Sequence, residues 1–410
     1  KARHPQIRLL ISIGGWTGSS YITDAALTAA SREKFVDAVI DLYILGNLPV
    51  NGSAGGTGAA AGVFDGIDID WEYPIFGGIE EARHSEKDND NLTELFKLFR
   101  AKLDAINPKL LLTAAIPGIM PYAGNYNLKD DQKYVDWYSI MTYDFTGGWN
   151  GITNHHTNLF SSAKDTSEAG AYFSFDYSVK LFRDTFGVSP DKLIPGAAFY
   201  GRGWVVNNTA NGGIGQQGSL ASGVHESGFN YYSHLKKMFA NDSCTLYWDM
   251  EAMAPYYFCP AAKEFWTLDD EQSIVLKSQY ADAYGLRGMM FWDICGDDSI
   301  GTLVNAIYTR NMPDADIRDS SFSPLSLKIK LLADSAKYYA GDNIIVSAEA
   351  EGSIARIEFF IDGKSIGCDT REPFNWVWFN AKPGKHEIKA EAVSFSGGKA
   401  VSAKTSITIE

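Results

Sequence analysis

Short apolar runs alternate with amphipathic segments between residues 9 and 310, and this alternation limits the possible fold more than any other feature of the chain. Each run has the length of a strand, and the segments between several runs repeat apolar residues at the helical period of 3.6. Such alternation indicates a mainly parallel sheet with helices packed outside it. The six runs are Leu9–Gly15, Val63–Glu72, Leu110–Pro117, Val135–Phe145, Leu193–Tyr200 and Gly288–Ile294.

Three helices are predicted from this periodicity. The first has apolar residues at positions 92, 95, 96, 99, 103 and 106. The second extends from Asp269 to Tyr284, with acids at its start and Gly285 as a C-terminal stop. The third has apolar residues at positions 300, 303, 304 and 307. The expected fold class is therefore α/β, a (β/α)8 barrel over residues 1–312.

A closed barrel of this kind needs eight strands, and the chain provides six. The segment from Lys1 to Gln6 resembles the tail of a helix that leads into a strand. The first two strands are therefore expected to precede Lys1. Without them, the barrel domain is expected to be N-terminally incomplete, with an exposed strand edge.

Two segments interrupt the alternation. Residues 46–62 are rich in Gly and Ala with almost nothing to bury, which predicts a flexible insertion loop. Residues 205–268 are polar and Gly-rich, then aromatic, and are too long for a plain connection. They are expected to form an α+β insertion subdomain that extends to residue 283 with the following helix.

A second domain is predicted after a polar, Pro-containing linker at residues 311–324. Beyond it, apolar and polar residues alternate at period 2, with turns at Asp362-Gly363, Pro383-Gly384 and Gly397-Gly398. Residues 325–410 are expected to form an immunoglobulin-like β-sandwich. Trp376 and Trp378 share a face and are expected to fill its core rather than grip a ligand.

The overall charge argues against two classes of partner. With 36 Lys and Arg against 50 Asp and Glu, the formal net charge is −14, and a field of this sign repels nucleic acid and anionic lipid. The sequence contains no apolar stretch of bilayer length. No partner other than the substrate is expected, and the protein is expected to be a monomer.

The most informative segment for chemistry is Phe64-Asp-Gly-Ile-Asp-Ile-Asp-Trp-Glu-Tyr-Pro74. Because residues two apart share one face of a strand, Asp68, Asp70 and Glu72 project the same way. Acids this close repel one another and titrate together, so one of them retains its proton towards neutral pH. Glu72 comes last, at the strand end where barrels place their active sites, and is the predicted general acid. A Mg²⁺ or Ca²⁺ site on these carboxylates is the alternative.

This segment resembles the acidic signature of glycoside hydrolase family 18, the chitinases and their relatives. Four other segments resemble the motifs of that family, occur in the same order and end predicted strands; Asp293 stands where many members have Glu. They are Ser12-Ile-Gly-Gly15, Met141-Thr-Tyr-Asp144, Tyr200-Gly-Arg-Gly-Trp204 and Gly288-Met-Met-Phe-Trp292. Ser12, Gly14 and Gly15 are expected to serve close strand packing.

The resemblance implies hydrolysis of β-1,4-linked N-acetylglucosamine with retention, in which the 2-acetamido oxygen of the substrate is the nucleophile. Glu72 is then the acid and Asp70 orients the acetamido group. Asp68 shares a proton with Asp70, and Tyr143 donates to the acetamido oxygen. No cofactor or metal is implied, and the family suggests a secreted enzyme.

The remaining candidates are substrate-binding residues. The resemblance places Asp144 and Met141 at the cleaved sugar and Trp292 beneath it, with Tyr200 and Arg202 nearby. Trp16 and Trp149 follow strand ends, where either sugar stacking or local packing is possible. Glu251, in the insertion, matches a substrate-contacting position of relatives. The full list is Asp144, Met141, Trp292, Tyr200, Arg202, Trp16, Trp149 and Glu251.

Two rival functions share this fold. One is a lectin that binds chito-oligosaccharides without cleaving them; such members typically lose the acid, whereas Glu72 is present. The other is an endo-β-N-acetylglucosaminidase acting on N-glycans, and the large insertion favours a linear polymer instead. Cys244 and Cys259 can form a bridge within the insertion, whereas Cys295 and Cys368 are expected to be unpaired.

Overall fold

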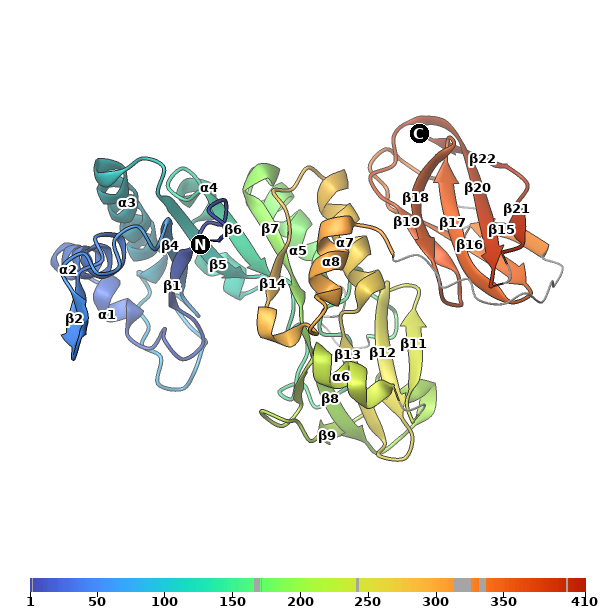
Figure 1. Cartoon of the computed structure of the whole chain (residues 1–410), viewed down its shortest axis with the longest axis horizontal. Coiled ribbons are helices and arrows are strands. Elements are labelled where there is room, and N and C mark those ends of the chain that lie inside the picture. The colour runs from blue at the N-terminus through green and yellow to red at the C-terminus, as the bar shows by residue number, and fades with distance from the viewer. Residues whose placement is uncertain are drawn as a thin grey trace. The chain divides into compact units, whose positions relative to one another are not determined.

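The computed structural model describes residues 1, 3–165, 170, 172–240, 243–312, 326–331, 337–395 and 397–410. Its residues group into two compact units, and Figure 1 labels their helices and strands. The first contains residues 1–145, 171–196 and 286–290. The second contains residues 146–170, 197–285 and 291–410. The predicted linker lies mostly outside the described residues.

The main sheet has six strands in the order β1-β4-β5-β6-β7-β14. Neighbouring strands from β1 to β7 pair in parallel, which confirms the predicted α/β fold of the barrel type. The strands are β1 (Leu10–Gly14), β4 (Gly66–Asp70), β5 (Leu111–Pro117), β6 (Trp137–Met141), β7 (Leu193–Ala198) and β14 (Met290–Trp292).

Helices connect these strands. The predicted first helix is α3 (Asp88–Ile106), in which Leu92, Leu95, Phe96, Phe99 and Leu103 are buried. Ile106, the last residue of the helix, is 46% exposed, so the apolar stripe ends one turn early. The other helical segments of this unit are α1 (Ile22–Ala26), α2 (Ala29–Val39), η1 (Ile40–Ile44), η2 (Tyr122–Asn125), α4 (Leu128–Asp131), α5 (Phe175–Lys180), η3 (Leu181–Thr185) and η4 (Pro190–Lys192).

The segment at residues 46–62, predicted to be a flexible loop, contains a β-hairpin instead. Strands β2 (Leu48–Asn51) and β3 (Ala54–Gly56) pair antiparallel with Asn51 opposite Ala54. The turn between them is Gly52-Ser53, and Gly52 has the positive φ of +60° that tight hairpin turns require at this position. A Cβ at Gly55 would lie 2.1 Å from the Pro49 carbonyl oxygen, so the strands approach closely only with glycine there. Glycine permits this hairpin, which is why composition alone misled the prediction.

The insertion forms its own antiparallel sheet in the order β10-β8-β13-β12-β11, with β9 paired to β8. Its first strand begins at Tyr200, directly after β7, earlier than the expected start at residue 205. Its elements are β8 (Tyr200–Val206), η5 (Ala210–Gly213), β9 (Gly218–Leu220), β10 (Phe229–Tyr231), α6 (Tyr232–Phe239), β11 (Thr245–Asp249), β12 (Ala254–Cys259) and β13 (Glu264–Leu268).

A disulfide joins Cys244 and Cys259 across the β11–β12 hairpin. Thr245 pairs with Phe258 in the register of the hairpin, which brings the two cysteines opposite each other. Among the described residues, Cys295 and Cys368 take part in no disulfide. The sequence left the bridge between Cys244 and Cys259 open, and the structure forms it.

Helix α7 (Glu271–Ala283) follows the insertion and is buried on most of its surface. The Asp270 side chain caps its start by accepting from the backbone N–H of Ser273. Gly285 has a φ of +66° just beyond its end, as predicted for a C-terminal stop. The predicted last helix is α8 (Thr302–Thr309), preceded by the short η6 (Ile294–Gly296). Ile300, expected in the apolar stripe of this helix, lies before its start and is 75% exposed.

The C-terminal region is an all-β sandwich of two sheets, as predicted. One has the order β15-β16-β19 and the other β18-β17-β20-β21, with β22 paired to β20. Trp376 is completely buried, which confirms it as a packing residue. The strands are β15 (Ser326–Leu331), β16 (Ile344–Glu351), β17 (Ile354–Ile361), β18 (Lys364–Asp369), β19 (Asn375–Trp378), β20 (Gly384–Ser394), β21 (Lys399–Val401) and β22 (Thr405–Ile409).

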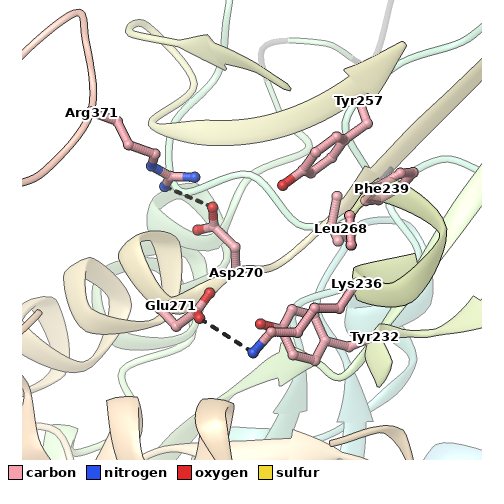
Figure 2. Close-up of a pocket in the computed structure, with 9 residues that line it drawn as sticks. Tyr232, Lys236, Phe239, Tyr257, Leu268, Asp270, Glu271 and Arg371 are labelled. Carbon is pink, nitrogen blue, oxygen red and sulfur yellow. Dashed lines mark ion pairs between the residues drawn. The ribbon is translucent and has the colours of Figure 1, made fainter. Parts of the chain in front are cut away.

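Polar contacts connect the sandwich with α7 inside the second unit. The Trp376 indole N–H donates to the Gln279 amide oxygen at 2.9 Å, and Arg371 pairs with Asp270 at 2.7 Å. Figure 2 shows Arg371 and Asp270 beside a cavity of about 310 Å³ that is also lined by side chains of the insertion. None of its lining residues belongs to the acidic signature.

Among the helices of the described residues, none is long and apolar enough to cross a membrane.

Candidate functional site

Strand β4 carries the acidic row at its carboxyl end. Asp68 and Asp70 belong to the strand, whereas Glu72 lies two residues beyond it. β4 is flanked by β1 and β5, so Asp68 is opposite Ser12 on one side and Thr113 on the other. The buried side chains of Ile67, Ile69 and Trp71 alternate with the acids, which confirms that the acids share one face.

Asp68 is held by a hydroxyl group on each oxygen. Ser12 Oγ donates to Oδ2 at 2.8 Å, and Thr113 Oγ1 donates to Oδ1 at 2.5 Å. Burial raises the pKa of Asp68, and these two hydrogen bonds oppose the rise. Ser12 is therefore a hydrogen-bonding partner of the site and not only a packing residue. The register of β1 against β4 gives it this role, because it places Ser12 opposite Asp68.

Asp70 is the most strongly perturbed carboxyl of the row. Burial, followed by the charges of Glu72 and Asp68, raises its pKa to about 8. Its Oδ1 atom is buried and has no hydrogen-bond partner among the described residues. Asp70 therefore retains a proton near neutral pH and has an oxygen available to a bound molecule.

Glu72 is 9% exposed. Its backbone N–H donates to Ser19 Oγ at 2.9 Å, and that hydroxyl donates in turn to the Gly15 and Asp70 carbonyl oxygens. Burial raises the pKa of the Glu72 carboxyl; a hydrogen bond from Tyr73 opposes this effect, and the charge of Asp144 adds to it. A carboxyl with a raised pKa is suited to general-acid chemistry.

Two residues that follow β6, Tyr143 and Asp144, interact electrostatically with the acidic row. Burial, with the charge of Asp70 as the next cause, raises the pKa of the Tyr143 hydroxyl, which keeps it protonated. A Cβ at Gly196 would lie 2.7 Å from the Tyr143 ring, so glycine makes room for the ring. Asp144 has a φ of +56°, a conformation that non-glycine residues adopt mainly where function or packing demands it. Met141 ends β6 and is half-buried.

In the second unit, the Arg202 guanidinium packs against three aromatic rings. Its guanidinium carbon lies 5.4 Å from the Trp149 ring centre and 5.3 Å from that of Tyr200, and Phe229 is the third ring. Arg202 also pairs with Glu226 at 3.3 Å. Tyr200 is only 2% exposed, so its ring supports Arg202 from within, whereas Trp149 is exposed.

Trp292 and Trp16 present open indole surfaces. Trp292 ends β14 and is 57% exposed; Trp16 follows β1 and is exposed as well. A flat apolar ring of this kind, left open to solvent, is what stacking on a sugar requires.

Glu251 lies in a hydrogen-bond network within the second unit. Its Oε2 accepts from the Ala163 N–H at 2.8 Å and from Ser162 Oγ at 3.4 Å. Ser162 also donates to Asp249, which pairs with His155 at 3.2 Å. In this arrangement Glu251 holds the segment after His155, so its predicted role in substrate binding stays a prediction.

Four residues that sequence reasoning did not select contact this site. They are Ser19, Tyr73, Thr113 and Tyr126. Thr113 had a signal, because it is the polar residue within an apolar strand. Ser19 and Tyr126 contact backbone atoms, which no sequence pattern marks.

Within the described residues, no three His, Cys, Asp or Glu side chains are grouped so that they could hold a metal ion. The two adjacent histidines, His155 and His156, are buried in a loop, and His155 pairs with a carboxylate.

Parallel strands with buried carboxyls at their carboxyl ends are the arrangement of a (β/α)-barrel protein. The model of glycosyl hydrolases family 18 matches residues 1–297, and the chain belongs to this family. A bacterial Ig domain matches residues 326–390.

Individual relatives agree with this assignment. The chain is 35% identical to chitinase A1 of Niallia circulans over 310 residues, which are 72% of this chain and 42% of the relative. It is 33% identical to chitinase 63 of Streptomyces plicatus over 75% of this chain and 46% of the relative. The chain thus spans less than half the length of these two relatives. The catalytic domain of psychrophilic chitinase B from Arthrobacter TAD20 matches with a TM-score of 0.70 and 35% identity, over 76% of this chain and 71% of that one.

Proposed function

We propose that this chain is the catalytic part of a chitinase that cleaves β-1,4 linkages between N-acetylglucosamine units with retention of configuration. The observation that carries the proposal is the row of buried carboxyls in which the pKa of Asp70 is raised to about 8 beside Glu72. Such a row provides one protonated acid and one negative charge at the same place, and both are needed when a glycosidic bond breaks.

In the proposed mechanism, Glu72 gives its proton to the glycosidic oxygen as the bond breaks. The acetamido carbonyl oxygen of the substrate attacks the anomeric carbon and forms an oxazolinium ion. Asp70 accepts a hydrogen bond from the acetamido N–H and stabilises the positive charge. Its Oδ1 atom, which has no hydrogen-bond partner among the described residues, is available to accept this bond. A water molecule then attacks the anomeric carbon and opens the ion, while Glu72, now a base, takes a proton from that water.

Tyr143 and Asp68 support these steps. The Tyr143 hydroxyl, which stays protonated, donates to the acetamido oxygen and holds it towards the anomeric carbon. Asp68, fixed by Ser12 and Thr113, stabilises a proton on Asp70. When Asp70 turns towards Glu72, this proton passes from Asp70 to Asp68, so that Asp70 is ionised when it faces the positive charge.

Chitin is the proposed substrate because the relatives that match over most of this chain are named chitinases. The proposal includes an extracellular location and action as a monomer. It places the barrel domain at residues 1–312, with the insertion at 205–283 within it, and the sandwich at 325–410.

The test is hydrolysis of chitin hexasaccharide, with the anomer of the first product followed by NMR. A β-anomer is expected at early times, because attack by the acetamido oxygen followed by water restores the starting configuration. An α-anomer would exclude this mechanism. Tight binding without cleavage would indicate a lectin, and preference for a high-mannose glycopeptide would indicate an endo-β-N-acetylglucosaminidase.

Trp292→Ala is expected to weaken binding and turnover together, by about tenfold each, because a stacking indole contributes about 1–3 kcal/mol to a bound ring. Kinetics on chitin hexasaccharide and calorimetric titration check this. The matched control is Trp137→Ala, since that indole packs under Arg287 at 4.7 Å and should affect stability rather than binding. Unchanged kinetics for Trp292→Ala would remove this residue from the proposed binding surface.

A further inference from the structure

Helix α7 carries uncharged polar side chains on the face that contacts the C-terminal sandwich. Gln272 and Gln279 are seven positions apart, close to two helical turns, so both lie on this face. Gln272 is buried, although glutamine is mostly exposed in proteins. The two amide oxygens accept hydrogen bonds from Arg371 at 2.7 Å and from Trp376 at 2.9 Å. This face of α7 is therefore covered by a partner that matches its polar groups.

Arg371 connects the sandwich with the start of the helix. Its guanidinium donates to Gln272 and also pairs with Asp270 Oδ2 at 2.7 Å (Figure 2). The other oxygen of Asp270 accepts from the backbone N–H of Ser273 and caps α7. One carboxylate thus serves both the helix cap and the sandwich. Because Asp270 is 4% exposed, loss of Arg371 would leave this charge buried without its cation.

The sandwich holds Arg371 in this position from its own side. Arg371 lies in the turn between β18 and β19, where the Asp369 carboxylate accepts from the backbone N–H groups of Arg371 and Asn375 at 3.0 Å each. Asp369 is buried, which strengthens these bonds. The guanidinium carbon also lies 5.7 Å from the ring centre of Trp248 in the insertion. The turn therefore presents Arg371 to its partners in a fixed place.

Contacts at the end of the helix match those at its start. The Asn380 side chain donates to the Ala283 carbonyl oxygen at 2.7 Å, and this carbonyl belongs to the last turn of α7, where the helix itself provides no donor. A Cβ at Gly367 would lie 2.2 Å from the indole nitrogen of Trp376, so glycine leaves the space through which the indole reaches Gln279. The sandwich thus contacts both ends of α7.

An aromatic contact belongs to the same interface. The fully buried Tyr280 ring meets Phe379 of the sandwich edge-on, with 5.5 Å between ring centres. Just beyond the helix, the Tyr284 hydroxyl donates to Asn343 Oδ1 at 2.9 Å. Relative motion is the usual expectation for two domains joined by few contacts. Here polar and aromatic contacts follow α7 along its whole length, which opposes such motion.

We propose that the sandwich is a permanent packing partner of α7 and that it unfolds together with the insertion as one cooperative unit. The interaction surface is the face of α7 with Gln272, Gln279 and Tyr280. Its partner is the sandwich of the same chain, through Arg371 and Trp376. The sandwich then stabilises the insertion, a role that does not depend on whether the chain cleaves chitin.

Arg371→Met tests this surface in the full chain. Methionine keeps a long apolar side chain beside Trp248 but has no charge and no hydrogen-bond donor. Hydrogen–deuterium exchange at residues 274–278 of α7 is expected to become at least about tenfold faster, because the helix opens more easily without its partner. Exchange in α3 is expected to stay the same. Unchanged exchange in α7 would overturn the proposal.

Lys404→Met is the matched control. Lys404 pairs with Glu387 at 2.7 Å within the same sandwich, and its loss should leave exchange in α7 as it is in the unchanged protein. An equal rise in α7 exchange in both variants would mean that Arg371→Met acts through the fold of the sandwich, and the proposed interface would be rejected.

A double-mutant cycle on the contact near the helix end provides a second measurement. Trp376→Phe removes the indole N–H, and Gln279→Leu removes its acceptor. The two shifts in unfolding temperature are expected to be less than additive in the double variant, because both remove the same contact. Fully additive shifts would contradict the proposal. So would unfolding of the sandwich apart from the insertion in the unchanged protein.

Discussion

Glu72→Gln is expected to lower kcat on chitin hexasaccharide by about 10³- to 10⁴-fold, the range over which general-acid catalysis usually contributes. Glutamine preserves the size of the side chain but has no proton to give to the glycosidic oxygen. Because this proton moves only in the transition state, binding of the oligosaccharide should remain close to that of the unchanged protein. Single-turnover kinetics and calorimetric titration measure the two effects separately.

Asp65→Asn is the matched control for this result. Asp65 precedes the same strand, but its carboxylate pairs with Lys1 and Arg8 and accepts from the backbone N–H of Leu9. Exchange of this acid for an amide should leave kcat largely unchanged. If Glu72→Gln retained near-full activity, the assignment of the acid would be wrong.

Lys277→Met is expected to have the largest effect on stability. Lys277 and Asp269 form an ion pair at 2.7 Å in which both side chains are fully buried. Thr157 donates to Asp269 at 2.9 Å, and the Ala198 N–H donates to it at 3.0 Å. Loss of one partner leaves an unpaired buried charge, which costs about 3–5 kcal/mol of the free energy of unfolding.

Denaturant unfolding of Lys277→Met checks this cost. The control is the double variant Lys277→Met with Asp269→Asn, in which neither charge remains; it should recover a substantial part of the loss, because the desolvation cost of the unpaired carboxylate is removed. Glu94, which pairs with Lys97 at 3.4 Å on the surface, provides a comparison: Glu94→Gln should cost less than about 1 kcal/mol. A small loss for Lys277→Met would show that water reaches the pair.

The strands and helices of the barrel region could be predicted because their residues follow one period over a whole element, as in α3. The antiparallel sheet of the insertion could not be ordered from sequence. β8 pairs with β13, whose first residue comes 64 positions after that of β8, and no local pattern specifies a pairing over that distance. The hairpin at residues 46–62 was missed because a glycine-rich segment has the composition of a loop. In this hairpin, however, glycine is needed because the two strands approach each other closely at Gly55.

The acids of the candidate site could be predicted because alternation along one strand places them on one face. Their partners could not. Ser12 and Thr113 contact Asp68 only through the register of three neighbouring strands, and a shift of one residue would turn both hydroxyls to the other face. Tyr73 contacts Glu72 beyond the end of the strand, where alternation no longer determines direction.

The bridge between Cys244 and Cys259 acts through the unfolded chain as much as through the folded one. It closes a loop with a sequence separation of 15 residues, and closure of such a loop removes about 3 kcal/mol of chain entropy from the unfolded ensemble. That stabilisation exists only where thiols are oxidised. The bridge across the β11–β12 hairpin therefore makes the stability of the insertion depend on its redox surroundings, so that protein matured in a reducing compartment would have the same residues but a less stable insertion.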